Sequence, residues 1–151
     1  MLDSPLTELR RRFPNAEEDT VRLEETAIPA LDFHIGHITA TALLDAKGIV
    51  TATNWYVSGT GGVLPGGIPM SSNWGELRRR YGEVAVEAGE LGVFVEFCSL
   101  PGLMLGLDEE TMPETTYRGL WDNPSPDSVP NSARIDRITI VRSSPPPEEC
   151  R

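Results

Sequence analysis

The two histidines of the chain lie three residues apart, in the segment Asp32-Phe-His-Ile-Gly-His37. In an extended strand, side chains alternate between the two faces, so Asp32 and His34 share a face and His37 points to the other. A zinc site needs three or four converging ligands, and the sequence holds no third histidine. We therefore expect no metal, no cofactor and no catalytic residue, and an enzyme is the less favoured class.

Residues 57–70 are rich in glycine and proline and resemble a phosphate-binding loop only in composition. The stretch Ser58-Gly-Thr-Gly-Gly62 is not followed by the Gly-Lys-Ser/Thr of a Walker motif. Leu64 stands where a dinucleotide-binding loop would carry its third glycine. We interpret residues 57–70 as a linker.

The chain has two cysteines, Cys98 in an apolar run and Cys150 one residue from the end. Two isolated cysteines do not make a disulfide framework, and the first twenty residues show no signal-peptide pattern. We therefore expect two unpaired thiols in the reducing cytoplasm. A disulfide between them is the alternative.

Acidic residues outnumber basic residues by 23 to 13 in this chain of 151 residues, which gives a formal net charge of −10. Binding to nucleic acid or to an anionic membrane needs a surplus of cations, so the sequence disfavours both partners. Residues 83–127 hold ten of the acids and one base, Arg118. A field of this kind steers a basic protein partner, although it could also serve only to keep the region soluble.

A segment of eight residues occurs twice, as LTELRRRF at 6–13 and as WGELRRRY at 74–81. In both copies apolar side chains at i, i+3 and i+7 predict a short amphipathic helix. Asn73 and Glu76 have the spacing of a capping box. Alternating or β-branched segments predict strands at 31–35, 38–44 and 49–56 after the first copy, and at 93–98, 103–107 and 134–141 after the second.

This order predicts an α+β fold of two tandem helix-plus-antiparallel-sheet repeats, which form one continuous or paired sheet. The first repeat spans residues 1–56, the linker 57–70 and the second repeat 71–142. The second repeat carries a long insertion at 109–132, and a proline-rich tail covers 143–151.

The second copy also has a Gly67-Ile68 turn, a helix ending at Tyr81-Gly82 and a closing Ile135-Asp-Arg-Ile138. In these features it resembles the repeat of a small outer-membrane lipoprotein. The tandem arrangement resembles the architecture of β-lactamase inhibitor proteins. The resemblance implies a protein-binding scaffold with a concave sheet face, and it names no partner.

The insertion 109–132 exceeds the roughly 12–15 residues beyond which loops in compact domains are uncommon and often functional. Its aromatic side chains lie among acids, a composition typical of interface anchors. The alternative is that residues 117–121 only pin the loop onto its own domain. The predicted partner-binding residues are Asp108, Glu109, Glu110, Glu114, Tyr117, Trp121 and Asp122.

These features favour a cytoplasmic, non-catalytic protein-binding inhibitor with a basic partner, in particular an immunity protein that neutralises a bacterial toxin. One alternative is a small-molecule-binding module or weak enzyme with a pocket between sheet and helix, for which His34, Asn54 and Trp55 are the pocket candidates. Another is an assembly or chaperone subunit, which would show a large apolar surface patch and stable oligomers.

Overall fold

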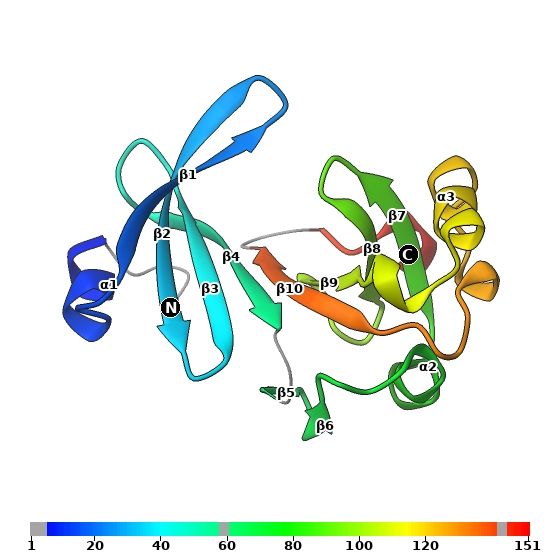
Figure 1. Cartoon of the computed structure of the whole chain (residues 1–151). Coiled ribbons are helices and arrows are strands. Elements are labelled where there is room, and N and C mark those ends of the chain that lie inside the picture. Colours follow the sequence, from blue (N-terminus) through cyan, green and yellow to red (C-terminus); the bar gives the residue numbers. More distant parts are fainter. Residues whose placement is uncertain (1–5, 58–60, 142–144) are drawn as a thin grey trace.

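The computed structural model describes residues 6–57, 61–141 and 145–151. Over these residues the chain forms ten strands, three short α-helices and three single turns of 3₁₀-helix (Figure 1). The strands are β1 (Glu17–Leu23), β2 (Thr26–Ile35), β3 (Ile38–Leu44), β4 (Val50–Val57), β5 (Val63–Leu64), β6 (Ile68–Pro69), β7 (Val84–Gly89), β8 (Gly92–Phe97), β9 (Leu103–Leu107) and β10 (Ile135–Val141). The helices are α1 (Leu6–Arg12), α2 (Trp74–Tyr81), α3 (Glu114–Asp122), η1 (Glu109–Thr111), η2 (Pro126–Ser128) and η3 (Glu148–Cys150).

Eight of these strands pair into one antiparallel sheet in the order β1-β2-β3-β4-β10-β9-β8-β7. The expected α+β fold of two helix-plus-sheet repeats is wrong. Strands from both halves belong to one sheet because β10 pairs with β4, from Arg137 opposite Tyr56 to Val141 opposite Ala52. Helices α1 and α2 have seven and eight residues, so each is about 10–12 Å long. Neither forms a layer comparable with the sheet, and the protein is a β-rich fold.

The two faces of the sheet differ in chemistry. Residues that pair directly across strands lie on the same face. On the face that the helices cover, called the helix face, one such row is apolar: Phe33, Ala40, Trp55, Ile138, Leu105, Val95 and Val86. On the opposite face, called the open face, the adjacent row is mostly polar: Asp32, Thr41, Asn54, Thr139, Met104 and Glu96.

The apolar core lies on the helix face, in two main clusters. The larger cluster lies over β7–β10, where α2 contributes Trp74 and Leu77 and α3 contributes Leu120. The smaller cluster lies over β2–β4, where α1 contributes Leu9. Trp55, in the middle of the sheet, packs against both clusters. The helices therefore cover the two ends of this face.

The segment 57–70, expected to be a linker, contains the β5–β6 hairpin. Leu64 of this hairpin is buried in the larger cluster. Residues 58–60 of that segment, residues 1–5 of the expected first repeat and residues 142–144 around the start of the expected tail lie outside the described residues.

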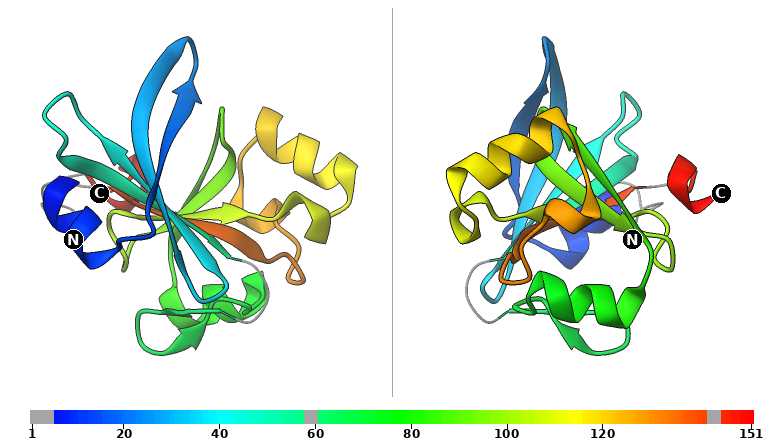
Figure 2. Two further views of the ribbon diagram at one scale, coloured as in Figure 1. Left: turned by 60° about the vertical axis from the view of Figure 1, so that its left-hand side comes forward. Right: turned by 90° about the vertical axis from the view of Figure 1, so that its right-hand side faces the viewer.

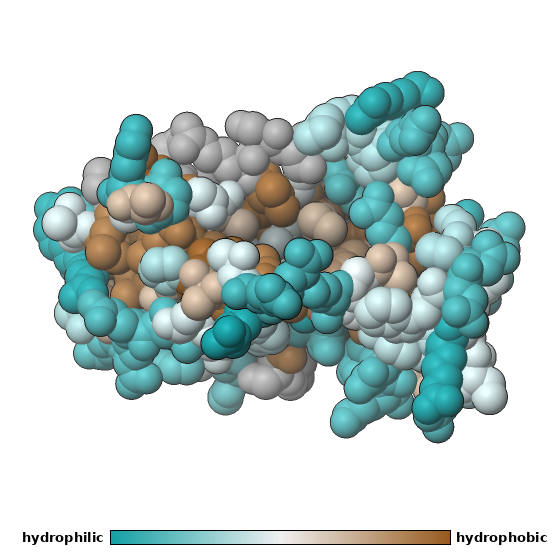
Figure 3. All heavy atoms as spheres, turned by 90° about the horizontal axis from the view of Figure 1, so that it is seen from above, coloured by the Kyte–Doolittle hydropathy of each residue, from teal (hydrophilic) through white to brown (hydrophobic). Residues whose placement is uncertain are grey.

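The turns of the β1–β2 and β7–β8 hairpins meet on the open side of the sheet, where the backbone N–H of Glu24 donates to Oε2 of Glu90 (2.5 Å). Both hairpins project to the same side of the molecule (Figures 1 and 2). Seen from that side, apolar side chains gather across the middle and hydrophilic ones at both ends (Figure 3). A hollow of about 540 Å³ lies there, with Phe94 and Met104 in its wall.

Cys98 and Cys150 form a disulfide, with their Cα atoms 5.4 Å apart. The expectation of two unpaired thiols is therefore wrong. The end of the chain returns to the sheet, where η3 lies against β7, and this brings Cys150 to the residue that follows β8. Disulfides persist mainly in oxidising compartments, so the expected cytoplasmic location loses the support that free thiols gave it.

Candidate functional site

The insertion 109–132 covers the β7 end of the helix face. Leu120 of α3 is fully buried in the larger apolar cluster. Tyr117 is partly buried, and its hydroxyl oxygen accepts a hydrogen bond from the backbone N–H of Val93 (3.2 Å). Trp121 is 44% exposed. Leu120 and Tyr117 thus pin α3 to the sheet, and Trp121 is the aromatic side chain that α3 leaves in solvent.

The predicted acidic residues play different parts. The Asp108 side chain accepts from the backbone N–H of Glu110 (3.0 Å) and caps η1. Glu114 forms an exposed ion pair with Arg118 on the same helix (2.5 Å), a type of pair that contributes about 0.3–0.5 kcal/mol. The remaining three lie exposed at the surface: Glu109, Glu110 and Asp122.

A cleft of about 410 Å³ lies between α3 and the turn of the β7–β8 hairpin. Its carboxylates come from three elements, namely the β7–β8 turn, η1 and β10, and its aromatic side chains come from α3. We call it the acidic cleft and define it by Glu90, Glu109, Tyr117, Trp121, Asp136 and Arg137.

Only part of the acidic cleft follows from the sequence. Glu109, Tyr117 and Trp121 are predicted partner-binding residues. Sequence reasoning misses Glu90 and the β10 residues, because they lie outside the insertion and reach the cleft only through strand pairing. The available signal is the pair Asp136 and Arg137 within a strand of mostly apolar residues.

Arg137 fixes one wall of the acidic cleft. Its guanidinium lies 4.6 Å from the ring centroid of Phe94 and 6.0 Å from that of Tyr56. Its Nη2 donates to the backbone oxygen of Leu91 in the β7–β8 turn (2.6 Å). A Cβ at Gly106 would come within 3.0 Å of the same Nη2, so the glycine leaves room for the guanidinium. Arg137 therefore holds the hairpin turn against the sheet.

The electrostatics of the acidic cleft favour a cation. Desolvation raises the pKa of Asp136 above its ordinary value of 3.8, and the neighbouring Arg137 opposes this. The charges of Asp108 and Glu109 raise the same pKa further. A carboxyl group perturbed by desolvation and like charges is stabilised in its ionised form by a nearby cation. A basic group in the cleft would supply that cation.

The three predicted pocket residues do not form one site. His34 is exposed on the open face, with Nδ1 3.1 Å from Oγ1 of Thr39. Asn54 is buried on the same face and accepts from the hydroxyl of Thr139 (2.5 Å). Trp55 belongs to the helix face. The sheet therefore separates Trp55 from the other two.

Asp32, on the open face, accepts a hydrogen bond from the Thr41 hydroxyl (2.5 Å). Desolvation raises the pKa of Asp32, and the bond from Thr41 opposes the rise. Within the described ranges no group of three or more His, Cys, Asp and Glu side chains is arranged to hold a metal ion. None of the helices in these ranges is long and apolar enough to cross a membrane.

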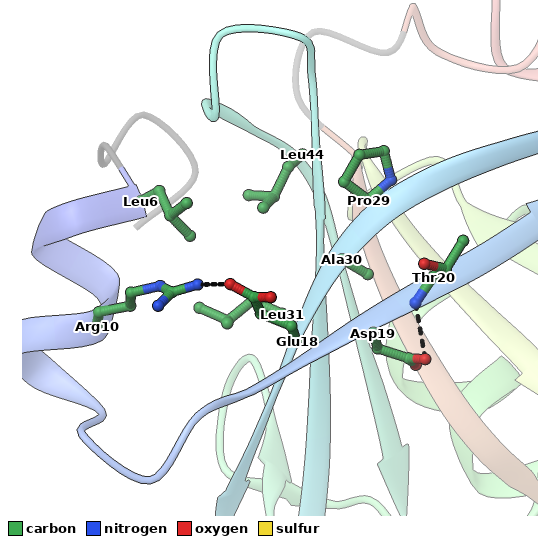
Figure 4. Close-up of a pocket in the computed structure, with 9 residues that line it drawn as sticks. All are labelled: Leu6, Arg10, Glu18, Asp19, Thr20, Pro29, Ala30, Leu31 and Leu44. Atoms are coloured by element: carbon green, nitrogen blue, oxygen red, sulfur yellow. Dashed lines mark hydrogen bonds and ion pairs between the residues drawn. The ribbon is translucent and has the colours of Figure 1, made fainter.

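A second pocket, of about 530 Å³, lies at the opposite end of the sheet, between α1 and the β1–β2 hairpin (Figure 4). Leu6, Leu31 and Leu44 supply apolar wall. Arg10 of α1 and Glu18 of β1 form an ion pair that joins the two elements beside it. With Asp19 the described lining has two acids and one base, so it carries less negative charge than the acidic cleft, which has three acids and one base.

No protein-family model matches the chain, and no curated protein matches it in sequence. Among solved structures, the chain is similar to the crystal structure of the uncharacterized protein yfeY from Escherichia coli, with a TM-score of 0.62 at 15% sequence identity. The match covers 94% of this chain and 92% of that chain, so it extends over both ends of the sheet. It shows a shared fold and assigns no activity to the acidic cleft.

Proposed function

We propose that the protein is a non-catalytic inhibitor that binds a basic protein through the acidic cleft. The observation that carries the proposal is the exposed Trp121 ring beside the carboxylates of Glu90, Glu109 and Asp136. Tryptophan is enriched among the residues that dominate binding energy at interfaces. A large aromatic side chain left exposed beside a concave, charged surface is typical of such a site.

A lysine or arginine side chain of the partner fits this arrangement. It would lie against the Trp121 ring, where a cation–π contact contributes about 0.5–2 kcal/mol, and within reach of the carboxylates. Arg137, the base of the cleft, already donates to the Leu91 carbonyl and stacks on Phe94. Its charge is therefore directed toward the sheet, and the carboxylates of Glu109 and Asp136 are left for the partner.

The target that best suits this surface is a protein that itself binds nucleic acid, because such a protein must carry a surplus of cations. An acidic inhibitor meets it quickly through electrostatic steering. An immunity protein against a bacterial toxin is the particular form that we propose. The Cys98–Cys150 disulfide favours an oxidising compartment for the encounter.

Capture from a lysate of the source cells, followed by titration of the captured protein, tests the proposal. The captured protein is expected to be basic, and its affinity is expected to fall steeply as salt rises. Glu109→Gln with Asp136→Asn should weaken binding at least tenfold, since both carboxylates line the cleft.

Glu17→Gln with Asp19→Asn provides the matched control, because it removes two charges from exposed positions at the start of β1, away from the turn that meets Glu90. This variant should bind within about twofold of the unmodified protein, as expected for distant rim charges. Equal losses in the two double variants would mean that net charge alone drives binding and that the acidic cleft is not the site.

A further inference from the structure

The middle of the helix face has a different cover from its ends. Eight strands about 4.8 Å apart make a sheet roughly 34 Å wide, and α1 and α2 pack over its two ends. Over β4 and β10, in the middle, lies the β5–β6 hairpin. Leu64 of the hairpin and Met70 just after it are buried there.

A cavity of about 300 Å³ remains between this hairpin and the sheet. None of the described residues that line it carries a charge. A 150 Å³ cavity of apolar walls is large enough to hold benzene, so this one has room for about 12 non-hydrogen atoms. Its main walls are Trp55, Leu103, Ile138 and Ile140 from the sheet, with Leu64 and Met70 opposite.

Two buried polar atoms on this face of β4 find no hydrogen-bond partner within the part of the chain that the structure describes. They are Nε1 of Trp55 and Oγ1 of Thr53. The two residues are two positions apart in an extended strand, so they share the helix face. Thr53 is 2% exposed and lies opposite Ile140, a cavity residue. Buried donors without partners are rare in native proteins and call for an explanation such as a ligand.

We propose that this cavity binds a small, neutral, apolar molecule with one carbonyl or hydroxyl oxygen, which accepts a hydrogen bond from Nε1 of Trp55. The apolar walls account for the body of the ligand. The unpaired indole N–H accounts for the oxygen. The absence of charge among the described lining residues disfavours an ionised group, because burying an unpaired charge is costly. The cavity is separate from the acidic cleft and does not depend on the proposed inhibitor function.

Titration of the full-length, ¹⁵N-labelled protein with 2-nonanone tests the proposal by NMR. The chain has three tryptophans, so each indole N–H signal serves as an internal control for the others. The Trp55 signal should shift and saturate, while those of Trp74, at the start of α2, and Trp121, in the acidic cleft, should stay in place. Nonanoate, which replaces the neutral end by a carboxylate, should bind at least tenfold more weakly.

Two variants separate the hydrogen bond from the cavity. Trp55→Phe keeps an aromatic wall but removes the donor, so its affinity for 2-nonanone, followed by backbone amide shifts, should fall about fivefold. Ile140→Phe fills the cavity and should abolish saturable binding. If the Ile140→Phe variant loses its dispersed amide spectrum, Leu103→Phe, at another wall of the cavity, is used in its place. An unmoved Trp55 signal, equal binding of nonanoate, or unchanged affinity in Trp55→Phe would overturn the proposal.

Discussion

The two edge strands of the sheet, β1 and β7, are protected from pairing with other chains in different ways. On the helix face, β7 presents Val84 and Val86, both buried, whereas β1 presents Glu18 and Thr20, both exposed. Helix α3 and the 3₁₀ turns η2 and η3 pack against β7. Beside β1 lies the pocket of Figure 4, next to which Arg10 of α1 pairs with Glu18. Unprotected edges invite pairing with other chains, and here one edge is protected by charge and the other by cover.

The difference links the fold to the proposed site. Covering β7 requires a helix with one apolar side, and α3 supplies it through Leu120. The other side of α3 faces solvent, next to the β7–β8 turn and the start of β10, and this is where the acidic cleft lies. The element that protects the edge therefore also presents Trp121. At the β1 end, the described lining of the Figure 4 pocket holds Arg10, Glu18 and Asp19, and so carries less negative charge than the acidic cleft.

Removing the disulfide should have the largest effect, and it should be felt at the β7 end. Cys98→Ala with Cys150→Ala is expected to lower the free energy of unfolding by about 4 kcal/mol, as loop closure predicts for residues 52 apart. Native-state hydrogen exchange should then rise more in β7 than in β1. Equal increases in both strands would contradict the view that this bond secures one edge.

Truncating a side chain of α3 that covers β7 should lower the free energy of unfolding by nearly as much. Leu120→Ala is expected to lower the free energy of unfolding by about 3 kcal/mol, because it empties a fully buried position in the larger cluster. Thr20→Ala, at an exposed position of β1, should change it by less than about 0.5 kcal/mol. Urea unfolding of both variants measures these free energies. Similar losses in the two variants would contradict the difference between the two edges.

Variants in α1 and α2, the helices at the two ends of the helix face, should differ more modestly in stability. In α2, the Asn73 side chain accepts from the N–H of Glu76 (2.9 Å), and the Glu76 side chain accepts from the N–H of Asn73 (3.3 Å). Asn73→Ala should therefore cost about 1 kcal/mol. Glu8→Ala breaks only the exposed pair with Arg12 in α1 (3.1 Å) and should cost less than about 0.5 kcal/mol. Thermal unfolding of both variants would reveal a reversed order.

The smallest expected effect concerns pH. Because the folded protein raises the pKa of Asp136 above 3.8, the folded state holds this proton more tightly than the unfolded state. Its contribution to stability is complete below pH 3.8 and is lost as the pH rises through the raised pKa. Asp136→Asn should remove that loss, so its unfolding free energy relative to the unmodified protein should rise as the pH increases from 3.8 through the raised pKa. A relative fall over this range would contradict the sign.

Local elements of the fold could be predicted from the sequence. The strands at 38–44, 49–56 and 103–107 match β3, β4 and β9, because their β-branched or apolar runs are long enough to be distinctive. The capping box at Asn73 and Glu76 is present as predicted. The pairing of β4 with β10 joins residues more than 80 positions apart, and no periodicity reports such a contact. That pairing joins strands of both halves in one β-rich fold with small helices, in place of two separate helix-plus-sheet repeats.

Two further features were missed for physical reasons. Strand β1 begins Glu17-Glu-Asp19 and is not predicted, because an edge strand tolerates charge on both faces and so lacks the apolar alternation that marks a strand. The disulfide depends on the path of the tail past β7, which spacing alone does not give. For the site, the sequence singled out Tyr117 and Trp121 together. The structure separates them, since the Tyr117 hydroxyl accepts a hydrogen bond from the backbone N–H of Val93 in the sheet and Trp121 stays exposed.

The affinity of the captured basic protein for the Trp121→Ala variant decides whether the acidic cleft is its binding site. If the acidic cleft is the binding site, this variant should bind at least 30-fold more weakly, as expected for an interface hot spot of about 2 kcal/mol or more. Ile35→Ala, which removes an apolar side chain of similar exposure (39%) at the far end of β2, should bind like the unmodified protein. Unchanged affinity in Trp121→Ala would mean that the acidic cleft is not the binding site.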